Sequence, residues 1–268
     1  MGGSATGGDI GSAARAAVRI AATGAIAARA LLRAGRARRA GGDAAARWAR
    51  AAVLADASRR VLALHGVTVR ASGPLPVRPV LLAANHVSYL DPLAVAAWVA
   101  CAPISKADLA HWPVFGAVAR RTGVLFHERG DARSGMKVMR EARRALEQGL
   151  PVLNFPEGTT SAGAGPLPFR PGLFGVARRA GVPVVPVAIA CHPPELAWVG
   201  DATFVPHFLA LAAREASEVR LTFGPPLRPE AYASAHDLAA AARACVSAML
   251  DPRADSPPPA VPALAGVS

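Results

Sequence analysis

The chain has 268 residues, of which 52% are hydrophobic, so it can form one large α/β domain with a substantial core. Its net charge of +12 is concentrated near the start: residues 1–50 hold nine Arg against two Asp, which indicates an anionic partner for that segment. The three cysteines, Cys101, Cys191 and Cys245, are widely spaced and indicate a reduced compartment, and the dispersed histidines argue against a zinc site.

The N-terminal segment predicts a pair of basic helices. Residues 1–9 are Gly-rich and predicted to be disordered, and helices are expected from Ile10 to about Ala40 and from about Asp43 to Leu64. The longest uncharged piece, Ile20 to Ala28, is far shorter than the roughly twenty residues of a bilayer span, so we expect no transmembrane helix. The apolar stretch is weak and no convincing cleavage site follows it, so we expect no signal peptide either. Residues 10–65 are instead expected to lie on an anionic membrane surface, the alternative being a solvated surface helix.

A polar stretch follows the apolar run Val80–Ala84, which predicts a buried strand, and extends from Asn85 to Pro92, a favoured first residue of a helix. His86 and Asp91 therefore lie in a strand-to-helix turn, where α/β proteins often place their chemistry. A carboxylate on one imidazole nitrogen fixes the tautomer in which the other nitrogen can take a proton from a hydroxyl. The alternative is that Asp91 only caps the helix and His86 packs in the turn.

The rest of the chain alternates between strand and helix signals. Strands are expected at 67–70, 104–106 (or a loop there), 124–126, 151–155, 184–189 and 219–223, and helices at 92–100, 113–121, 131–148, 173–180 and 237–250. Pro186 fits an edge strand or a bulge better than a central strand. A methionine-containing face of one helix is predicted to be core, and it consists of Met136, Met139, Ala142 and Leu146.

A second polar cluster follows the expected strand at 151–155. The sequence Pro156-Glu157-Gly158-Thr159-Thr160-Ser161 places a carboxylate, a glycine and three hydroxyls directly after that strand. Such a cluster is typical of a binding loop, although a tight turn with a Thr or Ser cap uses the same residue types. Like the His86 turn, this cluster directly follows the end of an expected strand, so we expect the two strand ends to belong to one site.

Four ordered blocks resemble those of the glycerolipid acyltransferases. They are Asn85-His86 to Asp91-Pro92, Phe126 to Arg129, Phe155 to Thr159, and Val182 to Val187. The sequence is most similar to bacterial 1-acylglycerol-3-phosphate acyltransferases and lyso-ornithine lipid acyltransferases, over roughly residues 60–230. One block is a weak signal, whereas four in the right order and spacing are a strong one.

The resemblance implies catalytic roles for two residues. His86 would be the general base that removes the proton from the acceptor hydroxyl as it attacks an acyl thioester, and Asp91 would orient it. The resemblance implies direct transfer, so Ser88 is expected to be a turn or helix-entry residue. Covalent catalysis by Ser88 is the competing mechanism.

The resemblance also implies substrate-binding residues, namely Lys106, Arg129, Glu157, Gly158 and Thr159. Arg129 would pair with the acceptor's phosphate, because the guanidinium fork can hold two anionic oxygens; otherwise it is an exposed arginine before a helix cap. Lys106 is a further expected phosphate contact. Glu157 and Gly158 would help to bind the acceptor, with Thr159 in the same turn. The alternative for Glu157 is a structural ion pair that joins two loops.

Two further segments resemble features of the family. Arg170 stands in a basic turn before a helix, where many relatives have a lysine beside it and this chain has Pro171. Trp198–Asp201 and Pro206–His207 are similar to a feature that builds the acyl tunnel or a wall near the membrane. His207 itself is expected to be an ordinary, partly buried histidine.

The expected fold is α/β, a mixed sheet flanked by helices with an N-terminal basic helical hairpin. The acyltransferase domain is expected at residues 66–250 and a disordered Pro-rich tail at 251–268. The resemblance implies acyl transfer from acyl-CoA or acyl-carrier protein, used as substrates without a cofactor, to a lysophospholipid. The expected acceptor is 1-acylglycerol-3-phosphate, which gives phosphatidic acid, and the alternative is another lysolipid such as a lyso-ornithine lipid.

The expected location is the cytoplasmic face of the inner membrane, as a peripheral or monotopic protein. The positive charge would also attract nucleic acid, but the chain has no aromatic platform or binding motif for it, so nucleic acid is not an expected partner. A non-catalytic anionic-lipid or nucleic-acid binding protein is the alternative from another class. The intact His86, Asp91 and Glu157 favour the enzyme.

Overall fold

The computed structural model describes residues 6–37, 42–77, 79–112, 114–128, 130–161, 165–200 and 202–251. The strands are β1 (Val67–Ser72), β2 (Leu81–Ala84), β3 (Ala102–Lys106), β4 (Leu125–His127), β5 (Val152–Asn154), β6 (Val184–His192) and β7 (Ser217–Phe223). The helices are α1 (Thr6–Ala37), α2 (Asp43–Leu64), α3 (Asp91–Trp98), α4 (Phe115–Thr122), α5 (Ala132–Glu147), α6 (Gly172–Ala180), α7 (Phe204–Ala213) and α8 (Ala235–Leu250). Short 3₁₀ helices are η1 (Ala107–His111), η2 (Pro194–Leu196) and η3 (Pro229–Ala231).

The strands form one mixed sheet in the order β1-β7-β6-β2-β5-β3-β4. The ladder from β6 through β2, β5 and β3 to β4 is parallel, β7 runs antiparallel to β6, and β1 is parallel to β7. The expected α/β class, a mixed sheet flanked by helices, is confirmed.

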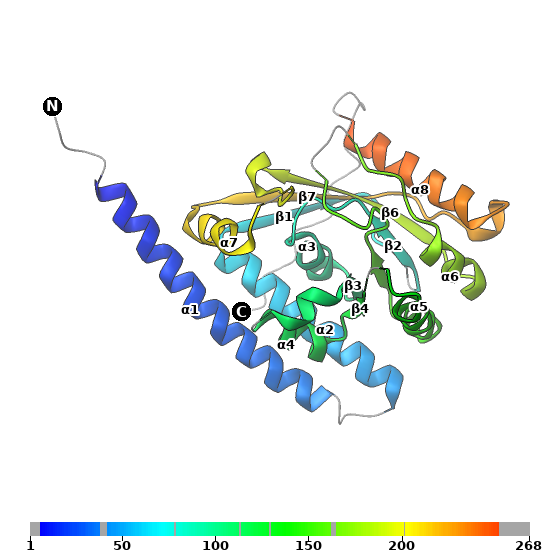
Figure 1. Cartoon of the computed structure of the whole chain (residues 1–268), viewed down its shortest axis with the longest axis horizontal. Coiled ribbons are helices and arrows are strands. Elements are labelled where there is room, and N and C mark those ends of the chain that lie inside the picture. Colours follow the sequence, from blue (N-terminus) through cyan, green and yellow to red (C-terminus); the bar gives the residue numbers. More distant parts are fainter. Residues whose placement is uncertain are drawn as a thin grey trace.

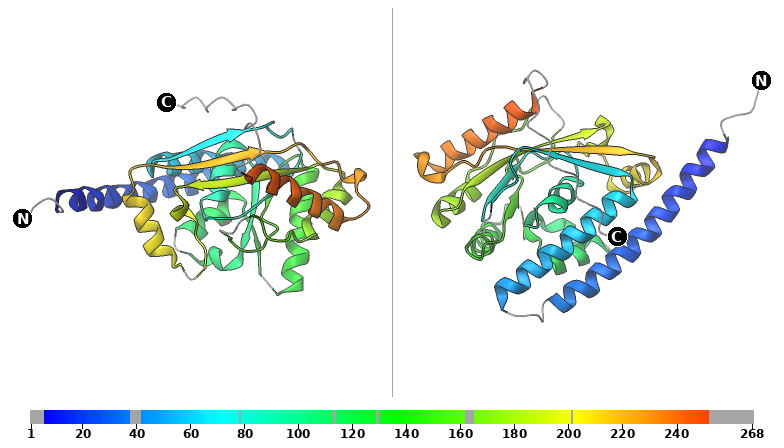
Figure 2. Two further views of the ribbon diagram at one scale, coloured as in Figure 1. Left: turned by 90° about the horizontal axis from the view of Figure 1, so that it is seen from above. Right: turned by 180° about the vertical axis from the view of Figure 1, so that it is seen from behind.

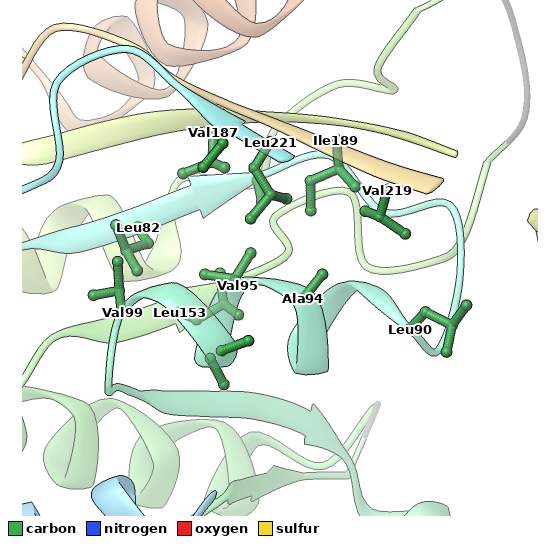
Figure 3. Packing of buried hydrophobic residues seen from close by; sticks show 14 of the residues in the cluster. Leu82, Leu90, Ala94, Val95, Val99, Leu153, Val187, Ile189, Val219 and Leu221 are labelled. Carbon is green, nitrogen blue, oxygen red and sulfur yellow. The ribbon is translucent and has the colours of Figure 1, made fainter. Parts of the chain in front are cut away.

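Helices cover both faces of the sheet (Figure 1). Leu82 and Ala84 of β2 pack in a cluster with residues of α2 and α3, and Figure 3 shows side chains of this cluster between α3 and the strands. Leu81 and Ala83, the alternate residues of β2, pack with α5, α6 and α8 on the opposite face. Because successive side chains of a strand point to opposite faces, a strand that is covered on both faces must be apolar throughout, as β2 is.

The N-terminal hairpin packs onto the same domain. Helices α1 and α2 lie side by side (Figure 2), and α1 also contacts α4 and α7. Arg15 donates to the carbonyl of Ala213 at 2.7 Å, and Arg19 donates to the carbonyls of Ala212 and Arg214, so both guanidiniums satisfy acceptors at the C-terminal end of α7. In the described part of the chain, none of the helices has the length and apolar character needed to span a bilayer.

The prediction for Pro186 is wrong, because β6 is the third of the seven strands and is paired on both sides. The Pro186 carbonyl accepts from Gly224 N at 2.9 Å, and the pairing with β7 begins only at Val187 opposite Phe223. The missing N–H of the proline therefore falls where the β7 ladder ends, which is how a central strand accommodates it.

Three other expectations differ from the structure. Helix α1 begins at Thr6, inside the segment predicted to be disordered, because extending an existing helix adds a hydrogen bond per residue. Met136 is 55% exposed, whereas Ala142 and Leu146 are core residues as predicted and Met139 packs partly buried against the core. Helix α7 was not expected at all. The predicted features at residues 1–5, 38–41 and 252–268 lie outside the described residues.

Candidate active site

The polar residues predicted from the sequence gather at one edge of the sheet. Strands β2, β5, β3 and β4 are adjacent and parallel, so their carboxyl ends lie together, and Leu81 to Ala83 align with Val152 to Asn154. His86 follows β2 and Glu157 follows β5, while Lys106 and His127 are the last residues of β3 and β4. The expectation that the two polar clusters meet is confirmed, and the carboxyl edge is where open α/β sheets bind ligands.

His86 is held by Asp91 and by an aromatic ring. Its Nδ1 lies 2.8 Å from Oδ2 of Asp91, and its ring stacks on Phe155 with a centroid distance of 4.2 Å. The Asp91 side chain is 0% exposed, and the same Oδ2 accepts from the backbone N–H groups of Val87 at 2.7 Å and Ser88 at 2.9 Å. A buried carboxylate on Nδ1 holds the proton there, so Nε2 is the nitrogen that can accept a proton from a hydroxyl.

Ser88 is fully buried in the turn and does not line the cavity described below. Its Oγ accepts a long hydrogen bond of 3.4 Å from Leu90 N, and its carbonyl accepts from Asp91 N at 3.1 Å. This environment suits the expected role in the turn before α3. A buried hydroxyl without access to a substrate is poorly placed to be a nucleophile.

Glu157 connects the turn after β2 with the loop after β5. Its side chain is buried; Oε1 accepts from His86 N at 2.9 Å, and Oε2 accepts from Ser161 Oγ at 2.7 Å and from Leu167 N at 3.0 Å. In return, Ser161 N donates to the carbonyl of His86 at 2.8 Å. The carboxylate therefore joins the two loops through backbone and hydroxyl groups, and no arginine of the described residues pairs with it.

The site opens into a cavity of about 560 Å³, which is within the usual size range for a ligand site. One end is polar and is lined by Lys106, His127, Thr159, Thr160 and Arg170. The other end is apolar and lies between α1, α2, α3 and α4, with walls that include Ile26, Ala27, Leu54, Ala57, Leu93 and Val118. His86 also lines the cavity, so its imidazole shares one cavity with both the polar and the apolar lining residues.

The predicted binding residues have different positions relative to this cavity. Lys106, Gly158 and Thr159 line it, whereas Glu157 is buried behind the loop that it stabilises. Arg129 lies outside the described residues. His127 and Arg170 were not among the predicted site residues; a basic side chain at the end of an expected strand, and another in a basic turn before a helix, were the signals for them.

An aromatic cluster closes the side of the site near Tyr89. His207 Nε2 lies 3.1 Å from the carbonyl of Glu195, which only accepts, so the Tyr89 hydroxyl donates to His207 Nδ1 at 3.0 Å. Burial raises the pKa of Tyr89 above its ordinary value. Trp198 N donates to the carbonyl of Val87 at 2.8 Å, and Trp198 and Phe204 line the cavity.

In the described part of the chain, neither the cysteines nor the metal-ligating side chains form a second candidate site. Burial raises the pKa of Cys101 to about 12 and also raises the pKa of Cys191 and Cys245, so none of the three thiols is activated. Within residues 6–251, apart from the short gaps, no group of three His, Cys, Asp or Glu side chains is arranged to hold a metal ion.

Comparison with known proteins gives consistent matches. A family model described as Acyltransferase matches residues 66–190. The chain is 36% identical to a lyso-ornithine lipid O-acyltransferase of Rhizobium meliloti over 64% of this chain and 65% of that protein. It is 36% identical to a lyso-ornithine lipid O-acyltransferase of Brucella abortus, over 63% of this chain and 70% of that protein. It is 38% identical to a 1-acyl-sn-glycerol-3-phosphate acyltransferase of Neisseria meningitidis, over 50% of this chain and 53% of that protein.

The fold has a counterpart among solved structures. The crystal structure of the 1-acyl-sn-glycerophosphate (LPA) acyltransferase PlsC from Thermotoga maritima matches with a TM-score of 0.59 and 23% identity, over 79% of this chain and 83% of that chain. The aligned part spans less than two thirds of the Rhizobium and Neisseria relatives. The sequence matches and the shared fold agree with the four ordered blocks. This chain belongs to the acyltransferase family that includes the lyso-ornithine lipid and 1-acyl-sn-glycerol-3-phosphate acyltransferases.

Proposed function

We propose that this protein transfers a fatty acyl group from a thioester donor to the free hydroxyl of a lysolipid. The observation that carries the proposal is the His86–Asp91 pair, which lies on a cavity with one polar and one apolar end. The apolar end suits an acyl chain, and the polar end suits a headgroup. Acyl-CoA or acyl-carrier protein would be the donor, and the chemistry requires no cofactor.

The His86–Asp91 geometry supports direct transfer. His86 Nε2 takes the proton of the acceptor hydroxyl as its oxygen attacks the thioester carbonyl, and Asp91 stabilises the imidazolium that forms. The new C–O bond forms, the C–S bond breaks, and the imidazolium returns the proton to the leaving thiolate. The products are an ester and a free thiol, and no acyl-enzyme is formed.

The proposed acceptor is 1-acylglycerol-3-phosphate, whose acylation gives phosphatidic acid. A lyso-ornithine lipid is the second candidate. It is supported by the similarity to the lyso-ornithine lipid O-acyltransferases of Rhizobium and Brucella. Both acceptors are lipids, so we propose that the protein works at the cytoplasmic surface of the inner membrane, as a peripheral or monotopic protein.

A substrate panel tests this function. The purified protein is incubated with an acyl donor, either acyl-CoA or acylated acyl-carrier protein. Each reaction contains one acceptor, namely lysophosphatidic acid, a lyso-ornithine lipid or lysophosphatidylcholine, and new diacyl products are measured by mass spectrometry. We expect turnover on at least one anionic or zwitterionic lysolipid. Absence of product with every donor and acceptor would contradict the enzyme and favour a non-catalytic lipid- or nucleic-acid binding protein.

A pre-steady-state experiment separates direct from covalent transfer. We expect thiol release without a burst, and no acyl label on the protein after quenching. A burst followed by a slower steady state, with label on Ser88, would show an acyl-enzyme and overturn the direct mechanism.

A further inference from the structure

The side chain of Arg170 lies against Gly158 at the polar end of the cavity. Gly158 has φ +74°, and a Cβ atom built on it would lie 3.0 Å from Cζ of Arg170 and 3.2 Å from its Nε and Nη1. Both residues line the cavity that His86 also lines. Any side chain at position 158 would therefore displace the guanidinium, so the glycine provides the space in which Arg170 sits.

The backbone around Arg170 is firmly held. Arg170 N donates to the carbonyl of Pro156 at 3.0 Å, and the preceding Phe169 is buried against the α5–α6–α8 side of the core. Leu167 N donates to Glu157, and Arg243 donates to the carbonyl of Leu167 at 3.2 Å. The loop that carries Arg170 is thus connected to the carboxylate that also holds His86 N.

The guanidinium of Arg170 has no protein acceptor among the described residues. Neighbouring arginines differ in this respect: Arg178 donates to the carbonyls of Pro229 and Ala233, and Arg243 donates to those of Pro166 and Leu167. Arg170 therefore keeps its donors available at the cavity end that also carries Lys106, His127 and two threonine hydroxyls. Nδ1 of His127 is buried and likewise has no partner in the described structure.

We propose that Arg170, seated on Gly158, binds the anionic headgroup of the acceptor, a phosphate or a carboxylate, and thereby selects anionic over neutral lysolipids. The inference rests on the proposed function, because it concerns the acceptor of that same reaction. A planar fork of N–H donors on a fixed backbone suits two oxygens of one anionic group. Asp108, which also lines the cavity, adds an acceptor for a positively charged part of a zwitterionic headgroup.

The test compares Arg170→Gln and Arg170→Lys with the wild-type protein on lysophosphatidic acid, a lyso-ornithine lipid and neutral monoacylglycerol. For Arg170→Gln we expect the KM of lysophosphatidic acid and of the lyso-ornithine lipid, which both carry an anionic group, to rise roughly 10- to 100-fold, because a charge-assisted pair is lost. The KM of the acyl donor and the rate on monoacylglycerol should stay within about twofold. Arg170→Lys should give an intermediate KM, because it keeps the charge without the fork.

Arg179→Gln is the matched control, because this exposed arginine of α6 does not line the cavity and its loss removes the same charge. It should leave all the KM values unchanged. The acceptor whose KM rises more in Arg170→Gln identifies the group that is bound: phosphate for lysophosphatidic acid, carboxylate for the lyso-ornithine lipid. An unchanged KM, or an equal rise for the neutral acceptor, would overturn the inference.

Gly158→Ala tests whether the glycine provides the space for the Arg170 guanidinium. We expect it to raise the KM of the anionic acceptor more in the wild-type background than in the Arg170→Gln background. The strain of an alanine at φ +74° is common to both backgrounds, whereas displacement of the guanidinium occurs only in the first. Equal effects in both backgrounds would contradict the claim that Gly158 positions Arg170. Binding of anionic lysolipid without a donor, measured by calorimetry, separates this inference from the proposed function: wild-type binding that Arg170→Gln weakens supports the inference even if no product forms.

Discussion

His86 is surrounded by contacts that each act on a different part of the residue. Asp91 holds Nδ1, Phe155 supports the ring face, and Glu157 accepts from the backbone N–H. Together these contacts fix one orientation of the imidazole, and a general base must be correctly oriented to accept the proton. The contacts of the Asp91 carboxylate with His86 and with the turn amides are all made by its Oδ2.

Glu157→Ala should lower both stability and activity. The substitution leaves the His86 N–H, the Ser161 hydroxyl and the Leu167 N–H without their acceptor, and we expect a loss of about 2–4 kcal/mol in the free energy of unfolding. Urea unfolding measures it, with Thr159→Ala as a control in the same loop, exposed and expected to unfold like the wild type. A Glu157→Ala protein of unchanged stability and raised acceptor KM would instead support the binding role predicted from the sequence.

The sequence identifies some of these contacts and not others, for a physical reason. His86 and Asp91 are five residues apart and meet across one turn, so local pattern alone indicates the pair. Glu157 reaches the backbone of a residue 71 positions away, and this contact depends on β2 and β5 being neighbours. The contact of Arg170 with Gly158 depends on the loop after β5 folding back, which no local pattern records.

At the scale of elements, the N-terminal hairpin forms a wall of the cavity. Ile26 and Ala27 of α1 and Leu54 and Ala57 of α2 line its apolar end, so the hairpin shapes the space for an acyl chain. Alanines in this wall leave room that larger side chains would fill.

Ala57→Leu should shift the acyl preference toward shorter chains. The added carbons would occupy the apolar end of the cavity, and we expect the rate with a long acyl donor to fall severalfold relative to a short one. Competition between acyl-CoA substrates of different length measures the ratio. Ala52→Leu, an exposed position of the same helix, is the control. An unchanged chain-length profile for Ala57→Leu would contradict the acyl-chain assignment of this end.

The contact between α1 and α2 should make stability depend on pH. His65, at the end of α2, is 1% exposed and lies with Nε2 2.9 Å from Thr23 Oγ1 of α1. Burial, with the nearby Arg19 charge, lowers the pKa of His65 to about 4 from an ordinary value of 6.5. Between those values the unfolded chain binds the proton more readily than the folded chain, so stability is lost as the pH falls from about 6.5 toward 4.

The urea midpoint at several pH values measures this loss. From about pH 7.5 to about pH 5 we expect His65 to account for a decrease of about 2 kcal/mol in the free energy of unfolding. His65→Asn should flatten the decrease, although it also lowers stability at neutral pH. An equally steep decrease in the variant would assign the pH dependence to other groups.

At the scale of the whole molecule, the structure divides the five arginines of α1 into two groups. Arg15 and Arg19 bind carbonyls of the domain and Arg33 pairs with Asp56, whereas Arg29 and Arg36 are exposed and have no hydrogen-bond or ion-pair partner among the described residues. Net charge alone could not separate these groups, because the separation depends on which face of α1 packs on α7. Among the five arginines of α1, Arg29 and Arg36 are therefore available to an anionic membrane.

Arg29→Glu combined with Arg36→Glu should weaken binding to anionic vesicles severalfold or more, while the melting temperature stays close to the wild-type value. Vesicle sedimentation at low and high salt measures the binding, which should decrease with salt. The control replaces Arg140 and Arg179, exposed residues of α5 and α6, with Glu and changes the net charge equally. An equal loss of binding in both double variants would show that net charge, not the α1 surface, is responsible.

The fold class and most element positions follow from periodicity and from turn residues. Asp43–Leu64 was predicted with its observed bounds, and the cap of α5 is Asp131, the first residue of the helix predicted at 131–148. The place of β6 in the centre of the sheet and the presence of α7 were not predicted. Strand order is set by pairing between distant segments, and the short α7 has no side-chain cap to mark its start.

The most direct test of the central claim is the rate of acyl transfer by His86→Ala and Asp91→Asn compared with the wild-type protein. All three are measured with one acyl thioester and the best acceptor of the panel, with circular dichroism to verify folding. We expect kcat to fall by roughly 10²- to 10⁴-fold in each variant, because each removes the general base or its orientation. Wild-type turnover that persists in a folded His86→Ala protein would contradict the account.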